Sequence, residues 1–143
     1  MRDAVTRFVA YCGPIAPAAD ADAYWAEVER MSQQSLRYYR RDPHIAGLVR
    51  SLLRDGLAVA PVTEIRALTA AWLGQLALVG QAVGAIRTDL PLDLMLSIGT
   101  AVTEGFDLWL VQHVDELDDE GFDRLAATIT DLYRRMATPV EAR

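Results

Sequence analysis

The residues best suited to chemistry are two histidines, one cysteine and several carboxylates. His113 follows Glu104 and Asp107 in a run with helical spacing, and it could bind a metal ion if it met Asp107 or Glu104 across a helix face. Helical di-metal proteins use Glu-x-x-His pairs, which project both ligands from one face, and the sequence contains none. We therefore predict no metal site and no cofactor.

Nucleophilic catalysis is not indicated either. Cys12 or a serine would need a histidine base and an orienting acid, and no local motif supplies them. Glycine-rich loops that cradle phosphates are absent. Because Cys12 is the only cysteine, no internal disulfide can form, and a multi-cysteine zinc site is excluded. The sequence predicts a protein that is not an enzyme.

The charge of the chain argues against a nucleic-acid surface. There are 14 basic residues, all arginines, against 20 acidic ones, which gives a net charge of -6. The arginines are scattered or lie beside acids, as at Glu29-Arg30 and Asp123-Arg124, so no cationic face is expected. We find no signal peptide and no apolar run near the roughly 18 to 20 residues that cross a bilayer. The sequence predicts a soluble, cytoplasmic protein without a membrane partner.

Apolar residues recur at three- and four-residue spacing along most of the chain, which is the helical period. No segment alternates apolar and polar residues as a half-buried strand does, so we predict the all-α class. Helices are expected at Asp22 to Arg41, Pro43 to Arg54, Val62 to Ala85, Leu92 to Leu117, and from the Asp118 to Gly121 turn to Pro139. The 143 residues divide into the end of a connecting helix (1–13), a linker (14–23), one domain (24–138) and a tail (139–143).

The stretch from Leu92 to Leu117 carries apolar residues on two sides. One side has Met95, Ile98, Val102, Phe106 and Trp109, and the other has Leu96, Leu110, Val111 and Val114. A helix with two apolar sides needs two packing partners. In the turn before this helix, Arg87 is expected to hold Asp89 and Asp93 as a structural clamp.

The sequence around this turn carries a family resemblance. From Gly80 to Met95 it reads GQAVGAIRTDLPLDLM, and Glu104, Phe106 to Trp109 and His113 follow. The run resembles the C-terminal domain of TetR family regulators, many of which have a glycine-rich helix end, an Arg-x-Asp turn and a proline-started helix in this order. The Asp42-Pro43 break after an aromatic-rich helix is similar to the family too, and the resemblance spans roughly residues 23 to 137.

The resemblance implies a TetR C-terminal-domain-like bundle of about five to six helices that binds a small molecule. It also implies a homodimer, in which the last two long helices of each subunit form a four-helix bundle. The family reads DNA with a preceding helix-turn-helix domain, and nothing before Pro14 is long enough to contain one. We therefore expect no DNA binding by this chain itself, whether it is a fragment of a longer regulator or a natural headless protein.

Site residues also follow from the resemblance, and small residues such as Gly99, Ala101 and Gly105 would let helices approach closely. The expected ligand-binding residues are Trp25, Met31, Ser35, Tyr38, Trp72, Leu76, Met95, Val102, Phe106 and Trp109. The expected dimer interface consists of Leu96, Thr103, Leu110, Val114, Phe122, Leu125, Ile129, Leu132 and Tyr133. Plain core packing is the alternative for each aromatic residue, and a helix contact within one chain is the alternative for the interface.

The expected function is that of an effector-binding and dimerisation domain of a TetR-like transcriptional regulator. Tryptophans, tyrosines and methionines with few hydroxyl groups are typical of sites for apolar or aromatic molecules. The alternative is a headless helical dimer that acts as a structural or interaction protein, or that sequesters ligands.

Overall fold

The computed structural model describes residues 6–7, 10–45, 47, 50 and 60–140, and the regular structure in these ranges is helical throughout. Its elements are α2 (Ala21–Arg41), α4 (Ala60–Ala82), α5 (Leu92–His113), the short 3-10 helix η1 (Val114–Glu116) and α6 (Asp119–Ala137). The predicted all-α class is confirmed for the described residues. Most of the helix predicted from Pro43 to Arg54 lies outside them.

Aspartate side chains cap the beginnings of α2 and α6. Asp20 accepts a hydrogen bond of 2.8 Å from the backbone N–H three residues later, at the start of α2. Asp118 does the same at 2.7 Å for α6. Asp42 accepts a bond of 3.0 Å from the N–H two residues later, just after α2 ends. Each cap satisfies an N–H group that the first turn of a helix leaves without a partner.

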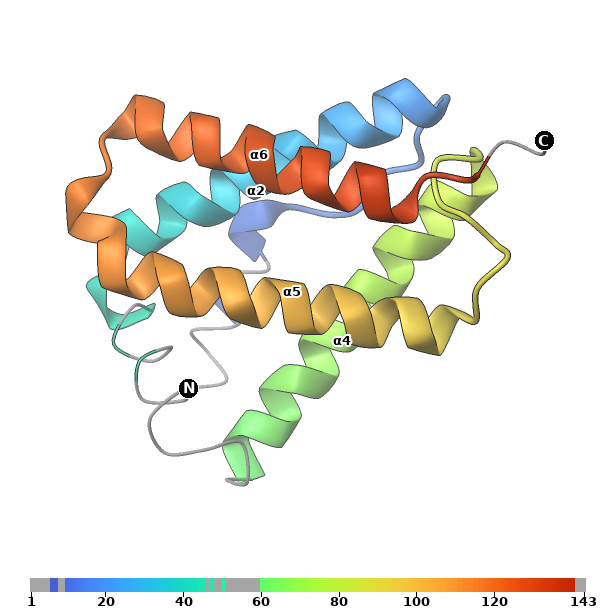
Figure 1. The fold of residues 1–143 in the computed structure, drawn as a ribbon. Helices are drawn as coiled ribbons and strands as arrows, with labels where there is room; N and C mark the ends of the chain where they lie inside the picture. The colour runs from blue at the N-terminus through green and yellow to red at the C-terminus, as the bar shows by residue number, and fades with distance from the viewer. Residues whose placement is uncertain (1–5, 8–9, 46, 48–49, 51–59, 141–143) are drawn as a thin grey trace.

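Helices α2 and α6 lie side by side and run in opposite directions, with α5 below them and α4 crossing behind α5 (Figure 1). Ion pairs at both ends of the α2–α6 pair agree with this arrangement. Arg40 contacts Asp119 at 2.5 Å at one end, and Arg134 contacts Asp22 at 3.2 Å at the other. Such exposed pairs contribute little to stability, so the register depends mainly on the apolar residues between the helices.

The main apolar cluster lies where α2, α5 and α6 meet. Its least exposed large side chains are Phe122 of α6 and Leu110 of α5, which are 0% and 2% exposed. Leu36 and Tyr39 contribute from α2. Because burying one such side chain contributes about 1.5 to 3 kcal/mol, this cluster is what holds the three helices together.

A second apolar cluster joins the start of α2 to the end of α4. Tyr24 and Trp25 of α2 pack there with Ile86, which follows α4. The glycine at position 80 makes this approach possible, since a Cβ atom on Gly80 would lie 2.4 Å from Ile86 Cγ1 and 2.6 Å from Tyr24 Cζ. Tyr24 also donates a hydrogen bond of 3.2 Å from its hydroxyl to the carbonyl of Leu76.

The turn between α4 and α5 contains the predicted arginine clamp. Arg87 donates bonds of 2.7 and 2.5 Å to the two carboxyl oxygens of Asp89. Asp93 was expected to join the clamp and does not. Its carboxylate instead accepts a hydrogen bond of 2.9 Å from the backbone N–H of Leu94 in the first turn of α5. The backbone N–H of Arg87 donates to the carbonyl of Ala137 at 2.7 Å, which ties this turn to the end of α6.

The crowding at Gly80 leads to a prediction for two glycines of the same helix. Replacing Gly80 with alanine should destabilise the protein by about 1 to 3 kcal/mol, because the added methyl group overlaps two side chains. Gly74→Ala is the matched control, since its Cβ would meet only Leu96 Cδ1, at 3.7 Å. It should stabilise the helix by about 0.5 to 1 kcal/mol. Urea unfolding monitored by circular dichroism measures both, and equal effects of the two variants would contradict the close contact.

Candidate functional site

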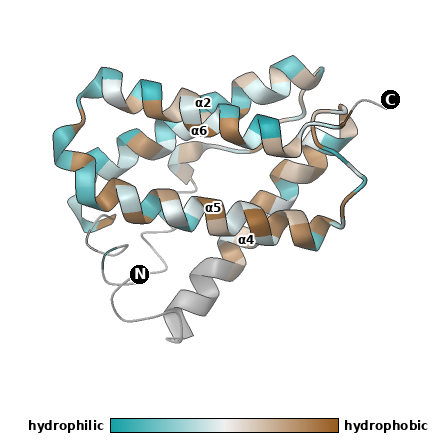
Figure 2. Cartoon of the chain, in the orientation of Figure 1, coloured by the Kyte–Doolittle hydropathy of each residue, from teal (hydrophilic) through white to brown (hydrophobic). Residues whose placement is uncertain are grey.

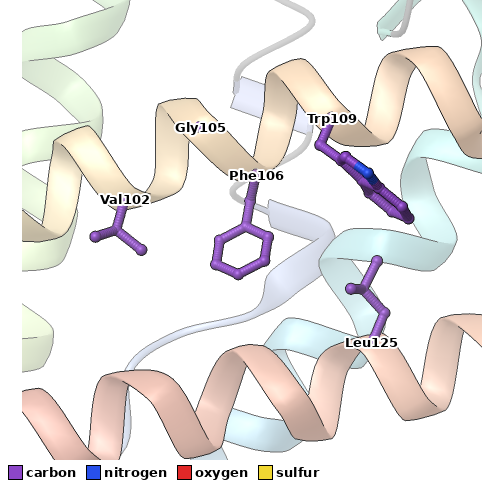
Figure 3. Close-up of a pocket in the computed structure, with 5 residues that line it drawn as sticks. All are labelled: Val102, Gly105, Phe106, Trp109 and Leu125. Carbon is purple, nitrogen blue, oxygen red and sulfur yellow. The ribbon is translucent and has the colours of Figure 1, made fainter.

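An apolar groove of about 380 Å³ lies between α5 and α6. Val102, Gly105, Phe106 and Trp109 of α5 and Leu125 of α6 line it. Phe106 points from α5 toward α6, and Trp109 lies across from Leu125 (Figure 3). None of these side chains is ionisable, so the groove is a shallow, open and almost purely apolar surface.

Helical spacing brings the α5 side of the groove together. Val102, Phe106 and Trp109 are separated by four and three residues, so they lie on one face of α5. Phe106 and Leu125 pack against the edge of the main cluster, which fixes the floor of the groove. Trp109 remains 42% exposed and stacks on the imidazole of His113, with ring centroids 4.3 Å apart.

A buried polar pair lies on the side of α5 that faces α2. The hydroxyl of Tyr39 donates a hydrogen bond of 2.9 Å to the carboxyl group of Asp107. Burial raises the pKa of Asp107 to about 6, the bond from Tyr39 lowers it, and the nearby charge of Glu104 raises it. The pKa of Tyr39 is raised well above its ordinary value, first by burial and then by the charge of Asp107.

A second polar contact joins α5 to α6 at the level of the groove. The hydroxyl groups of Thr103 and Tyr133 lie 2.5 Å apart, and Thr103 also donates to the carbonyl of Gly99 at 2.9 Å. Burial raises the pKa of Tyr133, so this hydroxyl keeps its proton and its bond at ordinary pH. These contacts fix the spacing of the two helices that form the groove.

Neither Cys12 nor His113, the groups that the sequence marked as possible catalysts, lines the groove. Cys12 is 1% exposed, and burial raises the pKa of its thiol to about 11, which disfavours the reactive thiolate. The Nδ1 atom of His113 lies 2.8 Å from the carbonyl of Trp109, at the end of α5. Within the described part of the chain, no three histidine, cysteine or carboxylate side chains are grouped to hold a metal ion.

The expected ligand-binding residues do not gather at one place. Val102, Phe106 and Trp109 line the groove. Trp25 belongs to the second cluster, with Leu76 and Met95 packed against it, whereas Tyr38 belongs to the main cluster. Met31 is buried and Ser35 is half-buried on α2, and the indole N–H of Trp72 is buried without a hydrogen-bond partner among the described residues.

The expected dimer residues are similarly divided. Leu110, Phe122 and Ile129 are buried inside the main cluster, and Val114, Leu125 and Tyr133 pack against it. Leu96 and Thr103 are half-buried on α5. Leu132 is 47% exposed on α6. The side chains of this set that can meet a second molecule are therefore the ones at or near the surface.

Sequence reasoning missed three features of this region. Gly105 was expected to allow a helix contact, but it forms part of the groove lining. Leu125 was assigned to the dimer face alone, although it closes the α6 side of the groove. The Tyr39–Asp107 pair was not foreseen because its members are 68 positions apart and no local pattern links them.

The outward face of α5 is apolar and uncovered. Leu94, Ile98 and Leu108 are 45%, 38% and 44% exposed, and hydrophobic residues recur along the helix in Figure 2. Gly105 has no atom within 4 Å of the position that a Cβ would take, so the surface there is open. Exposed apolar surface of this kind is typical of sites of contact with a protein, a membrane or a ligand.

The segment from Leu92 to Glu116 reaches the length and mean hydropathy of a membrane-crossing helix. The expectation concerned uninterrupted apolar runs, whereas this segment reaches the average hydropathy although Glu104 and Asp107 interrupt it. Only 11% of the most apolar 18-residue stretch of this segment is buried in the structure. The finding agrees with an uncovered apolar face and does not by itself assign a membrane.

Comparison of the chain with protein-family models, with curated proteins and with solved structures found no match. The structure establishes that the regular elements of the described residues are helices. The TetR-like arrangement and the dimer remain predictions from the sequence, and they are taken up below as proposals.

The buried carboxyl group gives a prediction for pH dependence. Because the pKa of Asp107 is about 6 in the folded protein and near 3.8 in the unfolded chain, the folded state binds more protons between these values. Stability should therefore fall as pH rises from 4 to 7, and Asp107→Asn, which cannot ionise but can accept the bond from Tyr39, should not share this loss. The two proteins should diverge by on the order of 1 to 2 kcal/mol over that range in urea unfolding. Parallel pH profiles would contradict the burial of this carboxyl group.

Proposed function

We propose that the chain is the effector-binding and dimerisation domain of a TetR-like transcriptional regulator, and that the α5–α6 groove receives an apolar or aromatic small molecule. One observation carries the proposal: the groove opens on a helix whose outer face is apolar and uncovered in the single chain. A regulator of this kind needs both a ligand site and a surface for its second subunit. Here the two lie on the same helix.

The lining of the groove supports the ligand class. It consists of one aliphatic side chain from each helix, two aromatic rings and a glycine, with no charged group that would favour a salt or a phosphate. Aromatic walls with few polar groups are typical of sites for apolar ligands. Trp109 lies at the rim, where a flat ring could stack on its exposed surface.

The exposed face of α5 supports a protein partner rather than a lipid bilayer. A membrane-spanning α5 would carry Asp107 near its middle, where a charged side chain costs about 3 kcal/mol. In the structure Asp107 is bonded to Tyr39 of α2, so one side of α5 is already committed to its own chain. The remaining side is then free to contact a second copy, as in helical bundles.

The contacts of α5 also suggest how a ligand would act. Phe106 touches both the groove and the main cluster, which includes residues of α2 and α6. A molecule that displaces Phe106 would change the packing of these helices. In a regulator, that change would alter the spacing of two DNA-reading domains.

A structural or ligand-sequestering helical dimer is the second candidate. The burial of Trp25, Met31 and Tyr38 favours it, since these residues were expected at the ligand site and are 5%, 2% and 8% exposed. Under this alternative the protein would dimerise but would show no specific response to small molecules.

Filling the groove tests the ligand site. Wild-type protein should bind the apolar dye anilinonaphthalene sulfonate and show a raised melting temperature with it, because the dye binds the folded state. Gly105→Leu should weaken dye binding about tenfold or more, since the new side chain would occupy the groove without a clash. Ser97→Leu is the control, because Ser97 lies on the same helix, is exposed and does not line the groove. Equal dye binding by both variants would contradict a site at this place.

The dimer is tested by sedimentation. At micromolar concentration the wild-type protein should behave as a particle of twice the 15.8 kDa chain mass. Leu108→Asp should weaken association roughly 30-fold or more, because a charge would be placed in an apolar contact. Leu78→Asp, at a leucine of α4 that is 49% exposed, should leave the dimer intact. A wild-type particle of single-chain mass would refute the dimer.

A further inference from the structure

A carboxyl group lies inside the apolar contact between α2 and α5. Asp107 of α5 accepts a hydrogen bond of 2.9 Å from the hydroxyl of Tyr39, which belongs to the main cluster and is 8% exposed. The arginine ion pairs of the described residues all involve other carboxylates. One neutral donor is weak compensation for a carboxylate that burial separates from water, so the charged form is held less well here than at the surface.

Other titratable groups lie around this pair on every element that packs there. They are Glu104 of α5, Tyr133 of α6, Tyr11 and Cys12 of the segment before α2, and Arg50, which donates to the carbonyl of Val111 one turn along α5. Glu104 carries a like charge that opposes ionisation of Asp107. Burial raises the pKa of Tyr133 and that of Cys12, so both keep their protons at neutral pH. A proton on Asp107 would remove the repulsion and leave the bond from Tyr39 in place.

The residue before Asp107 belongs to the groove. Phe106 lines the groove and packs against the main cluster, which also contains Tyr39. Consecutive side chains leave a helix about 100° apart, so a rotation of α5 that moves one of the two also moves the other. An ionised Asp107 gains solvation by turning toward water, and the same rotation would carry Phe106 away from its place in the groove.

We propose that Asp107 is a proton-operated lock between α2 and α5. With its proton, the carboxyl group stays against Tyr39 and the groove keeps its form. Loss of the proton loosens α5 and weakens the binding of an apolar ligand. This inference rests on the proposed function and adds to it a regulation of the same site by pH.

Protonation and ligand binding favour the same arrangement of α5, so each strengthens the other. Burial raises the pKa of Asp107 to about 6. Ligand affinity should therefore be greatest below this pH, where the carboxyl group is protonated, and should fall as the pH rises through it. A ligand that binds at neutral pH would in turn draw a proton onto Asp107.

Fluorescence titration with phenylnaphthylamine, an uncharged apolar dye, tests the lock. An uncharged probe is needed because the net charge of the chain itself changes with pH. The wild-type protein should bind the dye about fivefold or more tightly at about pH 5.5 than at about pH 7.5. Asp107→Asn, which cannot ionise and can still accept the bond from Tyr39, should bind it with nearly equal affinity at both.

Two further variants separate Asp107 from other groups. Histidine side chains also titrate in this range, and His113 stacks on Trp109 at the groove. His113→Gln should nevertheless keep the pH dependence. Tyr39→Phe should move the loss of dye affinity to higher pH, because the bond from Tyr39 lowers the pKa of Asp107. This shift is a second readout if Asp107→Asn loses helix content in circular dichroism.

The outcomes distinguish the lock from the ligand site. Equal dye affinity of the wild type at both pH values would overturn the lock and leave the ligand site standing. Unchanged pH dependence in a folded Asp107→Asn, or its disappearance in His113→Gln, would also overturn the lock, because another group would then be responsible. A wild-type protein that binds no dye at either pH would refute the ligand site, and the lock with it.

Discussion

The packing of Phe122 against Leu110 and Tyr39 is the interaction on which the rest of the structure depends. It joins α2, α5 and α6 in one apolar cluster, and its central side chain is 0% exposed. By taking up one side of α5, the cluster fixes which of its residues point inward and which point away. The groove and the exposed outward face of α5 both follow from that orientation, because they lie on the sides of α5 that the cluster does not fully cover.

The same packing explains why α5 combines apolar surface with a buried carboxyl group. Asp107 lies on the inward side, where Tyr39 supplies a hydrogen bond and burial raises the pKa of the carboxyl group to about 6. A buried polar group costs free energy unless it finds a partner, and this pair satisfies that condition. The pair also favours one orientation of α5 about its own axis, because turning the helix would move Asp107 away from the hydroxyl of Tyr39.

Much of the fold follows from local signals in the sequence, and most of the site does not. Apolar spacing and the Asp42-Pro43 break predicted α2 at Asp22 to Arg41, and the structure has it at Ala21–Arg41. Phe106 and Trp109 were correctly expected near one another, since three residues separate them on a helix. The roles of Leu125 and Tyr39 depend on how α6 and α2 are rotated against α5. That rotation is decided by contacts between residues far apart in the chain, which a periodic pattern does not encode.

The contacts around Gly80 and Arg87 have a mechanical consequence. Contacts at one end of the molecule hold the turn before α5 in place. Ile86 of this turn packs near Tyr24 of α2, and the backbone N–H of Arg87 is hydrogen-bonded to Ala137 at the end of α6. The other end of α5 is held as well, because Leu110 and Val111 are buried in the main cluster. With 22 residues at about 1.5 Å each, α5 is roughly 33 Å long and spans the distance between these two anchored ends. A change of packing at either end would therefore be transmitted along α5 to the other, because the helix between them moves as one rigid element.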